Sequence, residues 1–247
     1  MADEKEISAN NLEPSIIFED DDVLVINKPA GLIVHSDGKT KDKTLCDWLV
    51  SKYPEMVGVG EPLILQDGTT IDRPGIVHRI DRWTSGILIT AKNQNAHAFL
   101  KNQFQEREIK KTYYCFCYGV FRQNFGTINA PLGRSKGDFR QYTTPAKARG
   151  EMREAVTYYE VEKQGKNCAF VKVMPKTGRT HQIRAHMVHI GHPIVCDKVY
   201  AKRECLLGFE RMALHASSLI FRLPNGEQMS LEAPLPEDFV KAQKELA

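Results

Sequence analysis

The sequence lacks any long hydrophobic run. None of its apolar stretches approaches the roughly 18 residues that a membrane-spanning helix needs, so we expect a protein that does not cross a membrane. Its first residues, MADEKEISANNLEP, are acidic and polar, unlike a secretory signal or an Arg-rich transit peptide. Together these absences predict a cytoplasmic protein.

Cysteine is scarce, and its spacing indicates no metal-binding or disulfide framework. The six cysteines form no CxxC pair and lie mostly in apolar runs. In a cytoplasmic protein, such residues are usually packed, reduced thiols. We therefore expect neither disulfides nor a structural zinc site.

Several catalytic motifs are also missing. The sequence contains no GxxxxGK[ST] loop, no GxGxxG after a strand and no GxSxG turn, which argues against nucleotide hydrolysis, dinucleotide redox chemistry and α/β-hydrolase catalysis. His181, His186, His189 and His192 could suggest a metal site. However, Gly191 ends the predicted helix before His192, and no carboxylate stands at HExxH spacing, so we predict no metal.

Charge is present but unevenly distributed. Residues 1–30 hold eight acids and two lysines, a balance of −6, whereas residues 101–150 hold ten bases and three acids, a balance of +7. A basic section with interspersed Phe and Tyr suits a phosphate-rich partner whose bases stack on rings. The alternative is an ordinary solvated face.

Apolar periodicity and turn residues predict a mixed α+β fold, because strands and helices do not alternate strictly. We expect a hairpin over residues 15–35, and paired strands on either side of Gly165. Other strands are expected over 87–92, 110–120 and 215–221. Two helices are expected over residues 44–53 and 180–191. A third is expected to be capped by Asn95, and a last one to begin at Pro236. Residues 122–150 read as a basic, Gly-rich loop region.

One segment, GIVHRIDRWTSGILITAKN, places Asp81 between Arg79 and Arg82 and just before a Thr-Ser-Gly turn. Neighbouring cations would keep this carboxylate ionised, as a nucleophile or base requires. A structural ion pair is the alternative.

A second segment, PKTGRTHQIRAH, offers a helix start that could bind an anion. Thr180 is expected to cap the helix, with His181 and Arg184 on one side and Ile183 facing inward. Arg179 precedes them in the Gly turn. A surface helix with satisfied polar groups is the alternative.

The strand KKTYYCFCYG carries the third candidate. Alternation places Tyr113, Cys115 and Cys117 on one face. Tyr113 could stack on a base, or could simply pack in the core.

Taken together, five ordered segments resemble the RluA-type pseudouridine synthases. They are KPAGLIVH, RPGIVHRIDRWTSGILITAKN, KKTYYCFCYG, PKTGRTHQIRAHMVHIGHPIVCDKVY and RMALHASSLIF followed by LEAPLPEDF. The resemblance covers about residues 16–240 and implies a mixed, largely antiparallel bisected sheet flanked by helices, with a central cleft. It also implies isomerisation of uridine in rRNA or tRNA, without cofactor or metal, by a cytoplasmic monomer.

The resemblance assigns roles to individual residues. Asp81 would be the catalytic carboxylate, Tyr113 the ring that stacks on the target base, and Arg184 the partner of the carboxylate. The target base must leave its stack, which costs a few kcal/mol and calls for an aromatic partner. Expected substrate contacts are His78, Arg79, Arg82, Thr84, Arg179, His181 and Ile183.

Some positions depart from the family pattern. Trp83, Ser36, Cys196 and Leu223 replace residues that are usually an acid, Pro, Gly and His, respectively. We expect residues 1–14 to be a flexible lead-in and residues 15–247 to form one catalytic domain, without the S4 module of many relatives. The segment before the central motif resembles the large-subunit rRNA branch more than the tRNA branch. A catalytically idle RNA-binding or ribosome-assembly protein is the rival from another class, and a metal-dependent hydrolase is a weaker one.

Overall fold

The structure is a computed structural model that describes residues 12–38, 40–65, 67–138, 141–145 and 148–246. Most of the expected lead-in, residues 1–11, lies outside the described residues. The chain divides into two compact units. Unit 1 comprises residues 1–109 and 219–233, and unit 2 comprises residues 110–218 and 234–247.

Unit 1 is built on the antiparallel strands β1 (Ser15–Glu19), β2 (Val23–Lys28) and β5 (Ser85–Ala91). Strand β2 pairs with both others, and the predicted hairpin is confirmed. Every residue of β5 is buried, because its apolar run SGILITA is covered on both faces. Strand β14 (Gln228–Glu232) pairs with β13 (Leu214–Arg222), whose last four residues belong to this unit.

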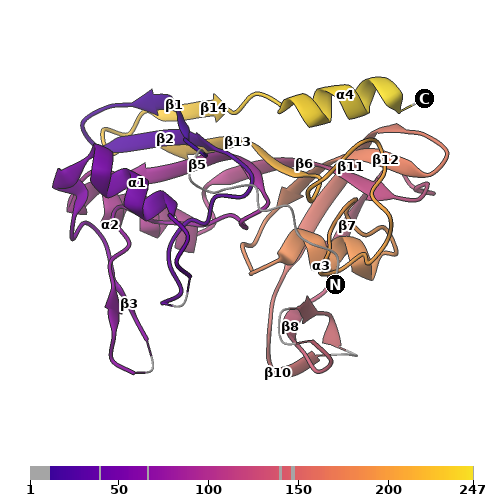
Figure 1. The fold of residues 1–247 in the computed structure, drawn as a ribbon, viewed down its shortest axis with the longest axis horizontal. Coiled ribbons are helices and arrows are strands. Elements are labelled where there is room, and N and C mark those ends of the chain that lie inside the picture. Colours follow the sequence, from indigo (N-terminus) through magenta and orange to yellow (C-terminus); the bar gives the residue numbers. More distant parts are fainter. Residues whose placement is uncertain (1–11, 39, 66, 139–140, 146–147, 247) are drawn as a thin grey trace. The chain divides into compact units, whose positions relative to one another are not determined.

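Two helices and a short hairpin complete unit 1. Helix α1 (Leu45–Lys52) begins with a capping box between Thr44 and Asp47, and the 3-10 helix η2 (Pro54–Met56) follows it. Helix α2 (Gln94–Gln105) is capped by Asn93, whose side chain accepts the Ala96 amide. The cap was expected at Asn95, and this prediction was wrong because Asn93 is the residue with extended backbone. Strands β3 (Leu63–Ile64) and β4 (Thr70–Ile71) form a hairpin that projects from the unit (Figure 1).

Unit 2 contains the strand order β6-β12-β11-β7, with antiparallel pairing throughout. The strands are β6 (Lys110–Tyr118), β7 (Phe125–Asn129), β11 (Val156–Gln164) and β12 (Cys168–Pro175). The predicted β11–β12 pair around Gly165 is confirmed. On β6, the Cys115 and Cys117 sulfurs lie 3.5 Å apart, on the common face that alternation predicts.

A small second sheet in unit 2 has the order β10-β8-β9. Its strands are β8 (Leu132–Ser135), β9 (Tyr142–Thr143) and β10 (Ala148–Arg153). Together with β7, it corrects the expectation that residues 122–150 are a loop. The polar side chains of this segment hide its strand periodicity, since most of them face solvent.

Two helices complete unit 2, α3 (Gln182–His189) and α4 (Glu237–Glu245). Helix α4 buries Phe239 completely, against the rings of Phe116, Phe209 and His215. The observed architecture is therefore the predicted mixed α+β class with mostly antiparallel sheets. No helix in the described part of the chain is long and apolar enough to span a membrane.

Candidate active site

In unit 1, Asp81 stands half-buried in the connection that leads into β5. The Thr84 amide donates to the Asp81 carbonyl at 3.1 Å, which closes a tight turn over residues 81–84. The next carbonyl, that of Arg82, accepts from the Gly31 amide at 2.8 Å and from the Lys28 ammonium at 3.1 Å. The backbone that carries the Asp81 carboxylate is therefore held by three hydrogen bonds to the carbonyls of residues 81 and 82.

Lys28 is the centre of this arrangement. It lies at the end of β2 with 0% of its surface exposed. Its ammonium donates to the carbonyls of Pro29 and Leu32, both at 2.8 Å, as well as to that of Arg82. Three carbonyl acceptors match the three hydrogens of a protonated lysine, so the buried charge ties the Pro29–Leu32 turn to the Asp81 loop.

The two arginines beside Asp81 have different surroundings. Arg79 is exposed and donates from Nη1 to Nε2 of His35 at 3.1 Å. The other nitrogen of His35 lies 2.8 Å from the Ser36 carbonyl, so the proton of the neutral ring sits on Nδ1. Burial lowers the pKa of His35 and favours this neutral form.

Arg82 pairs with Asp42, with 2.9 Å between Nη1 and Oδ2, and its guanidinium lies over the Trp83 ring. This pair is more than one third exposed, so it is weak and open to exchange for another anion. The buried Nε of Arg82 and Oγ1 of Thr84 have no hydrogen-bond partner among the described residues.

His78 is placed differently from the arginines. Its Nε2 accepts the Ile89 amide of β5 at 3.1 Å, and its ring stacks on Phe104. These contacts fix the imidazole against a strand and a helix of unit 1.

In unit 2, Tyr113 lies half-buried near the start of β6, opposite Val173 of β12. Further along, Cys115, Phe116 and Cys117 are completely buried. The strand therefore packs into the core from both faces at its C-terminal end, whereas its first half retains exposed surface.

The start of α3 is organised by Gln182 rather than by Thr180. The expected Thr180 cap is wrong: the capping position is His181, whose φ of 55° is left-handed and whose side chain makes no capping bond. Instead, Oε1 of Gln182 accepts the Arg179 amide at 3.0 Å and the Thr177 hydroxyl at 2.7 Å.

The same glutamine reaches into the core. Its Nε2 donates to the Val156 carbonyl and to Oγ1 of Thr157. The Thr157 hydroxyl lies 2.8 Å from Nδ1 of His186, whose Nε2 lies 2.9 Å from the Ala130 carbonyl. Since a carbonyl only accepts, Nε2 of His186 carries a proton. Burial correspondingly lowers its pKa.

Arg184 projects from α3 into a buried ion pair. Its Nε donates to Oδ2 of Asp197 at 2.7 Å and its Nη2 to Oδ1 at 2.9 Å, and both side chains are less than one tenth exposed. The guanidinium also lies 4.8 Å from the centre of the Tyr200 ring. A bidentate pair and a ring contact together fix the plane of this guanidinium.

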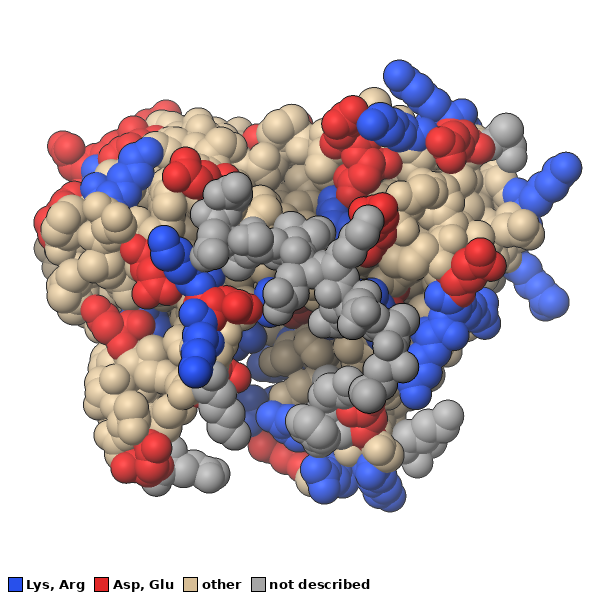
Figure 2. Space-filling view, viewed as in Figure 1, with Lys and Arg blue, Asp and Glu red and all other residues tan. Residues whose placement is uncertain are grey.

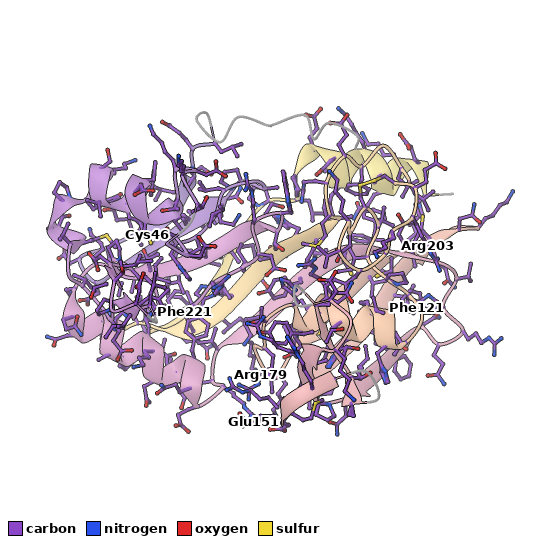
Figure 3. All side chains as sticks on the ribbon, turned by 60° about the horizontal axis from the view of Figure 1, so that its bottom comes forward. Cys46, Phe121, Glu151, Arg179, Arg203 and Phe221 are labelled. Atoms are coloured by element: carbon purple, nitrogen blue, oxygen red, sulfur yellow. A yellow bond between two sulfur atoms is a disulfide. The ribbon has the colours of Figure 1, made fainter. Side chains whose placement is uncertain are left out.

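The other predicted residues of this segment lie close by. His181 Nδ1 is 3.2 Å from the Tyr200 hydroxyl, and Ile183 is buried in the core. Arg179 donates from Nε to the Glu154 carbonyl at 3.1 Å. This contact holds it at the side of unit 2 where Glu151 of β10 also lies (Figure 3).

A disulfide joins Cys196 and Cys205 and closes the loop that contains Asp197 and Tyr200. The expectation that every cysteine is a reduced thiol is therefore wrong for this pair. The other four, Cys46, Cys115, Cys117 and Cys168, are free and buried as expected. No sequence pattern predicts the bond, because the spacing is not a recognised motif and the two α-carbons approach to 4.7 Å only in the folded loop.

Comparison with known proteins identifies the family. Residues 22–189 match the RNA pseudouridylate synthase family. The chain is 39% identical, over 94% of its length and 71% of the relative, to the ribosomal large subunit pseudouridine synthase D of Pseudomonas aeruginosa. The chain belongs to the RNA pseudouridylate synthases.

Other members of the family agree. An uncharacterized RNA pseudouridine synthase of Bacillus subtilis is 38% identical over 96% of this chain and 74% of its own length. The structure of human RNA pseudouridylate synthase domain containing 1 aligns with a TM-score of 0.72 and 26% identity, covering 94% of this chain and 87% of that one. The predicted RluA-type resemblance is thus confirmed. As an RNA pseudouridylate synthase, the protein is an isomerase that converts uridine to pseudouridine in RNA.

The family match contains the three predicted catalytic residues but ends before Asp197. Sequence reasoning missed both Asp197 and Lys28. A lysine at the end of a strand and an aspartate in a polar loop carry no signal of burial, since both types are normally exposed.

Proposed function

We propose that the protein modifies specific uridines of 23S ribosomal RNA, with Asp81 as the nucleophile. The observation that carries the choice of RNA is the similarity to the large-subunit synthase of P. aeruginosa, which extends over nearly the whole chain. The choice of Asp81 rests on the HRIDRWTSG segment and on the rigid turn that presents this carboxylate.

The reaction rearranges bonds without adding or removing atoms. The N1–C1′ bond of uridine breaks, the base turns, and C5 joins C1′. The proton leaves C5 and N1 gains one. In the proposed mechanism, the Asp81 carboxylate attacks C1′ as N1 leaves, and Tyr113 stacks on the extruded base. The bond between Asp81 and C1′ breaks when C5 joins C1′, which returns the free carboxylate. Arg184 is proposed as the cationic partner of the carboxylate, the role that the family resemblance implies.

This chemistry involves no net oxidation or hydrolysis, so we propose that it proceeds without a metal or cofactor. We also propose that the protein is a cytoplasmic monomer and that residues 15–247 act together as one catalytic domain. Undiminished turnover in the presence of a strong chelator is the expected result. Loss of turnover, with recovery on adding a divalent metal, would favour the rival hydrolase-like metal site.

Phosphate contacts are proposed for exposed bases of unit 2. In the view of Figure 2, Lys and Arg side chains line one edge and the lower part of this unit. Among the described residues between β6 and β11, the exposed bases are Arg122, Arg134, Lys136, Arg149 and Arg153. Because each neutralised phosphate releases counterions, affinity for RNA should fall steeply as salt rises. Arg149→Gln is expected to reduce that salt dependence by about one unit of slope.

The test of the nucleophile is Asp81→Asn with Asp21→Asn as a matched control. Asp21 is exposed in the turn between β1 and β2, so its substitution should leave turnover unchanged. Since C5 loses its proton, tritium at C5 of uridine is released in each turnover. We expect release by wild type and D21N, none by D81N, and RNA binding by all three. Release by D81N at the wild-type rate would remove Asp81 from the mechanism.

The RNA target is tested by mapping pseudouridines in cells with and without the gene. Loss of one or more sites in 23S rRNA is expected, and a loss confined to tRNA would favour the tRNA-directed alternative. If the protein binds RNA but no pseudouridine depends on it in any RNA fraction, the alternative of a catalytically idle RNA-binding or ribosome-assembly protein would be favoured.

A further inference from the structure

The Cys196–Cys205 disulfide closes the loop CDKVYAKREC, which begins two residues after the buried Ile194. The loop supplies two contacts of Arg184, the carboxylate of Asp197 and the ring of Tyr200. Its shape therefore helps to set where this guanidinium lies.

The connection between loop shape and Arg184 is direct. Oδ1 of Asp197 accepts the amides of Val199 and Tyr200, at 3.0 and 3.1 Å, in addition to Nη2 of Arg184. The Ala201 amide donates to the Asp197 carbonyl. Any rearrangement of the loop backbone thus changes the orientation of the carboxylate that holds Arg184.

The two sulfurs differ in access. Cys205 is exposed, whereas Cys196 is 3% exposed. A thiolate in solution would attack the Cys205 sulfur and release Cys196 as the leaving thiolate, which then gains a proton. The Cys196 sulfur lies 3.4 Å from the Phe209 carbonyl, so the reduced thiol already has an acceptor for its hydrogen.

A second tie would survive reduction. The Tyr118 hydroxyl accepts the Cys196 amide at 3.2 Å and donates to the Glu204 carbonyl at 2.6 Å. It thereby bridges the same two ends of the loop as the disulfide, while Arg203 lies over its ring. The reduced loop would remain attached but lose its covalent restraint.

Two residues of the loop have unfavourable backbone angles, so the loop is expected to change conformation when the disulfide is reduced. Cys196 and Lys202 both have left-handed φ, at 60° and 49°. Non-glycine residues keep such conformations only where the surroundings impose them.

We propose that Cys196 and Cys205 form a reversible redox site that controls how firmly Arg184 is held. The proposal rests on the proposed role of Arg184 in pseudouridine formation. In the switching step, a dithiol reduces the protein disulfide by thiol–disulfide exchange. The protein gains two thiols, and the dithiol, a small molecule or a protein of that class, becomes a disulfide. Disulfides in reducing compartments are usually transient devices of this kind.

The experiment compares oxidised wild type, wild type reduced with dithiothreitol, and Cys205→Ser in both buffers. Maleimide labelling after denaturation should find four free thiols in the oxidised protein and six after reduction. We expect kcat for tritium release to fall by roughly tenfold on reduction, less than the ~100-fold loss that a 1 Å misplacement can cause. KM for RNA should stay within about twofold, because a positioning defect acts on the reacting state. The kcat of C205S should equal that of the reduced wild type and should not change when dithiothreitol is added.

Three results would overturn the redox site. They are equal kcat in both states of the wild type, full activity of C205S, or six free thiols under oxidising conditions. A change in melting temperature with unchanged kcat would likewise reduce the bond to a structural one. If the proposed function itself were wrong, the oxidised wild type would release no tritium at all, which distinguishes that outcome from failure of the redox site.

Discussion

Replacing Lys28 by methionine tests how the loop of Asp81 is held. Methionine fills the space of the lysine stem but offers no hydrogen to the three carbonyls around the ammonium. The Arg82 carbonyl keeps its bond from the Gly31 amide. The carbonyls of Pro29 and Leu32 lose the donor that the structure gives them.

The size of the effect follows from these two carbonyls. A buried acceptor left without its donor costs about 1–3 kcal/mol, so the loss is roughly 2–6 kcal/mol. Removing a buried charge recovers part of this, which leaves a net destabilisation of about 3 kcal/mol. For a chain of this size, 1 kcal/mol corresponds to about 2–4 °C, so Tm should fall by roughly 6–12 °C.

The assay is thermal unfolding followed by circular dichroism, with Lys166→Met as the matched control. Lys166 is exposed in the turn between β11 and β12, and surface changes usually stay within about 0.5 kcal/mol. We also expect K28M to have a lower kcat at a temperature where it is fully folded, because the Asp81 turn loses an anchor. If K28M melted within about 2 °C of wild type, the ammonium would not be holding these carbonyls.

Three further outcomes are expected. Asp197→Asn should destabilise the protein by about 3 kcal/mol, measurable by urea denaturation, because it removes one charge of a buried, bidentate ion pair with Arg184; an unchanged midpoint would contradict the buried pair. Burial lowers the pKa of His186 below 6.5, so the unfolded chain binds more protons there and stability should decrease as pH falls below about 6.5, by up to ~1.4 kcal/mol per pH unit. A smaller pH dependence in His186→Gln would support this assignment, and an identical one would refute it. Gly75→Ala should fail to accumulate as folded protein in a solubility assay, because its Cβ would lie 2.2 Å from the Ala91 carbonyl oxygen at a φ of 66°; normal yield and Tm would show that this backbone can shift.

Sequence patterns predicted the strands whose alternation or apolar runs are strong. The β1–β2 hairpin, β5, β6 and the β11–β12 pair follow from hydrophobic runs punctuated by turn residues. The short strands β8, β9 and β10 were missed because they are brief and largely polar. Their existence depends on pairing with each other, which a local pattern does not record.

Sequence motifs point to candidate residues such as Asp81 and Arg184, whose catalytic roles stay predictions, but they do not point to contacts that form only in the folded loop. Asp81 and Arg184 lie in segments with specific motifs. The ion pair of Asp197 and the disulfide can be recognised only in the folded loop that brings their partners together. Cys196 is an example of a residue whose role could not be predicted from the sequence. The resemblance leads us to expect glycine there, and the observed φ of 60° is one that glycine adopts readily, yet this chain keeps the conformation with a side chain that also forms a covalent bond.

The division of the chain between the two units has a practical consequence. Each unit is assembled from two separate stretches, and the boundaries fall after residues 109, 218 and 233. Strand β13 itself supplies residues to both. A truncation at any one of these points would therefore leave at least one unit without part of its own chain, so neither half can be produced by simply shortening the gene, and intact protein is needed for every measurement of folding or turnover.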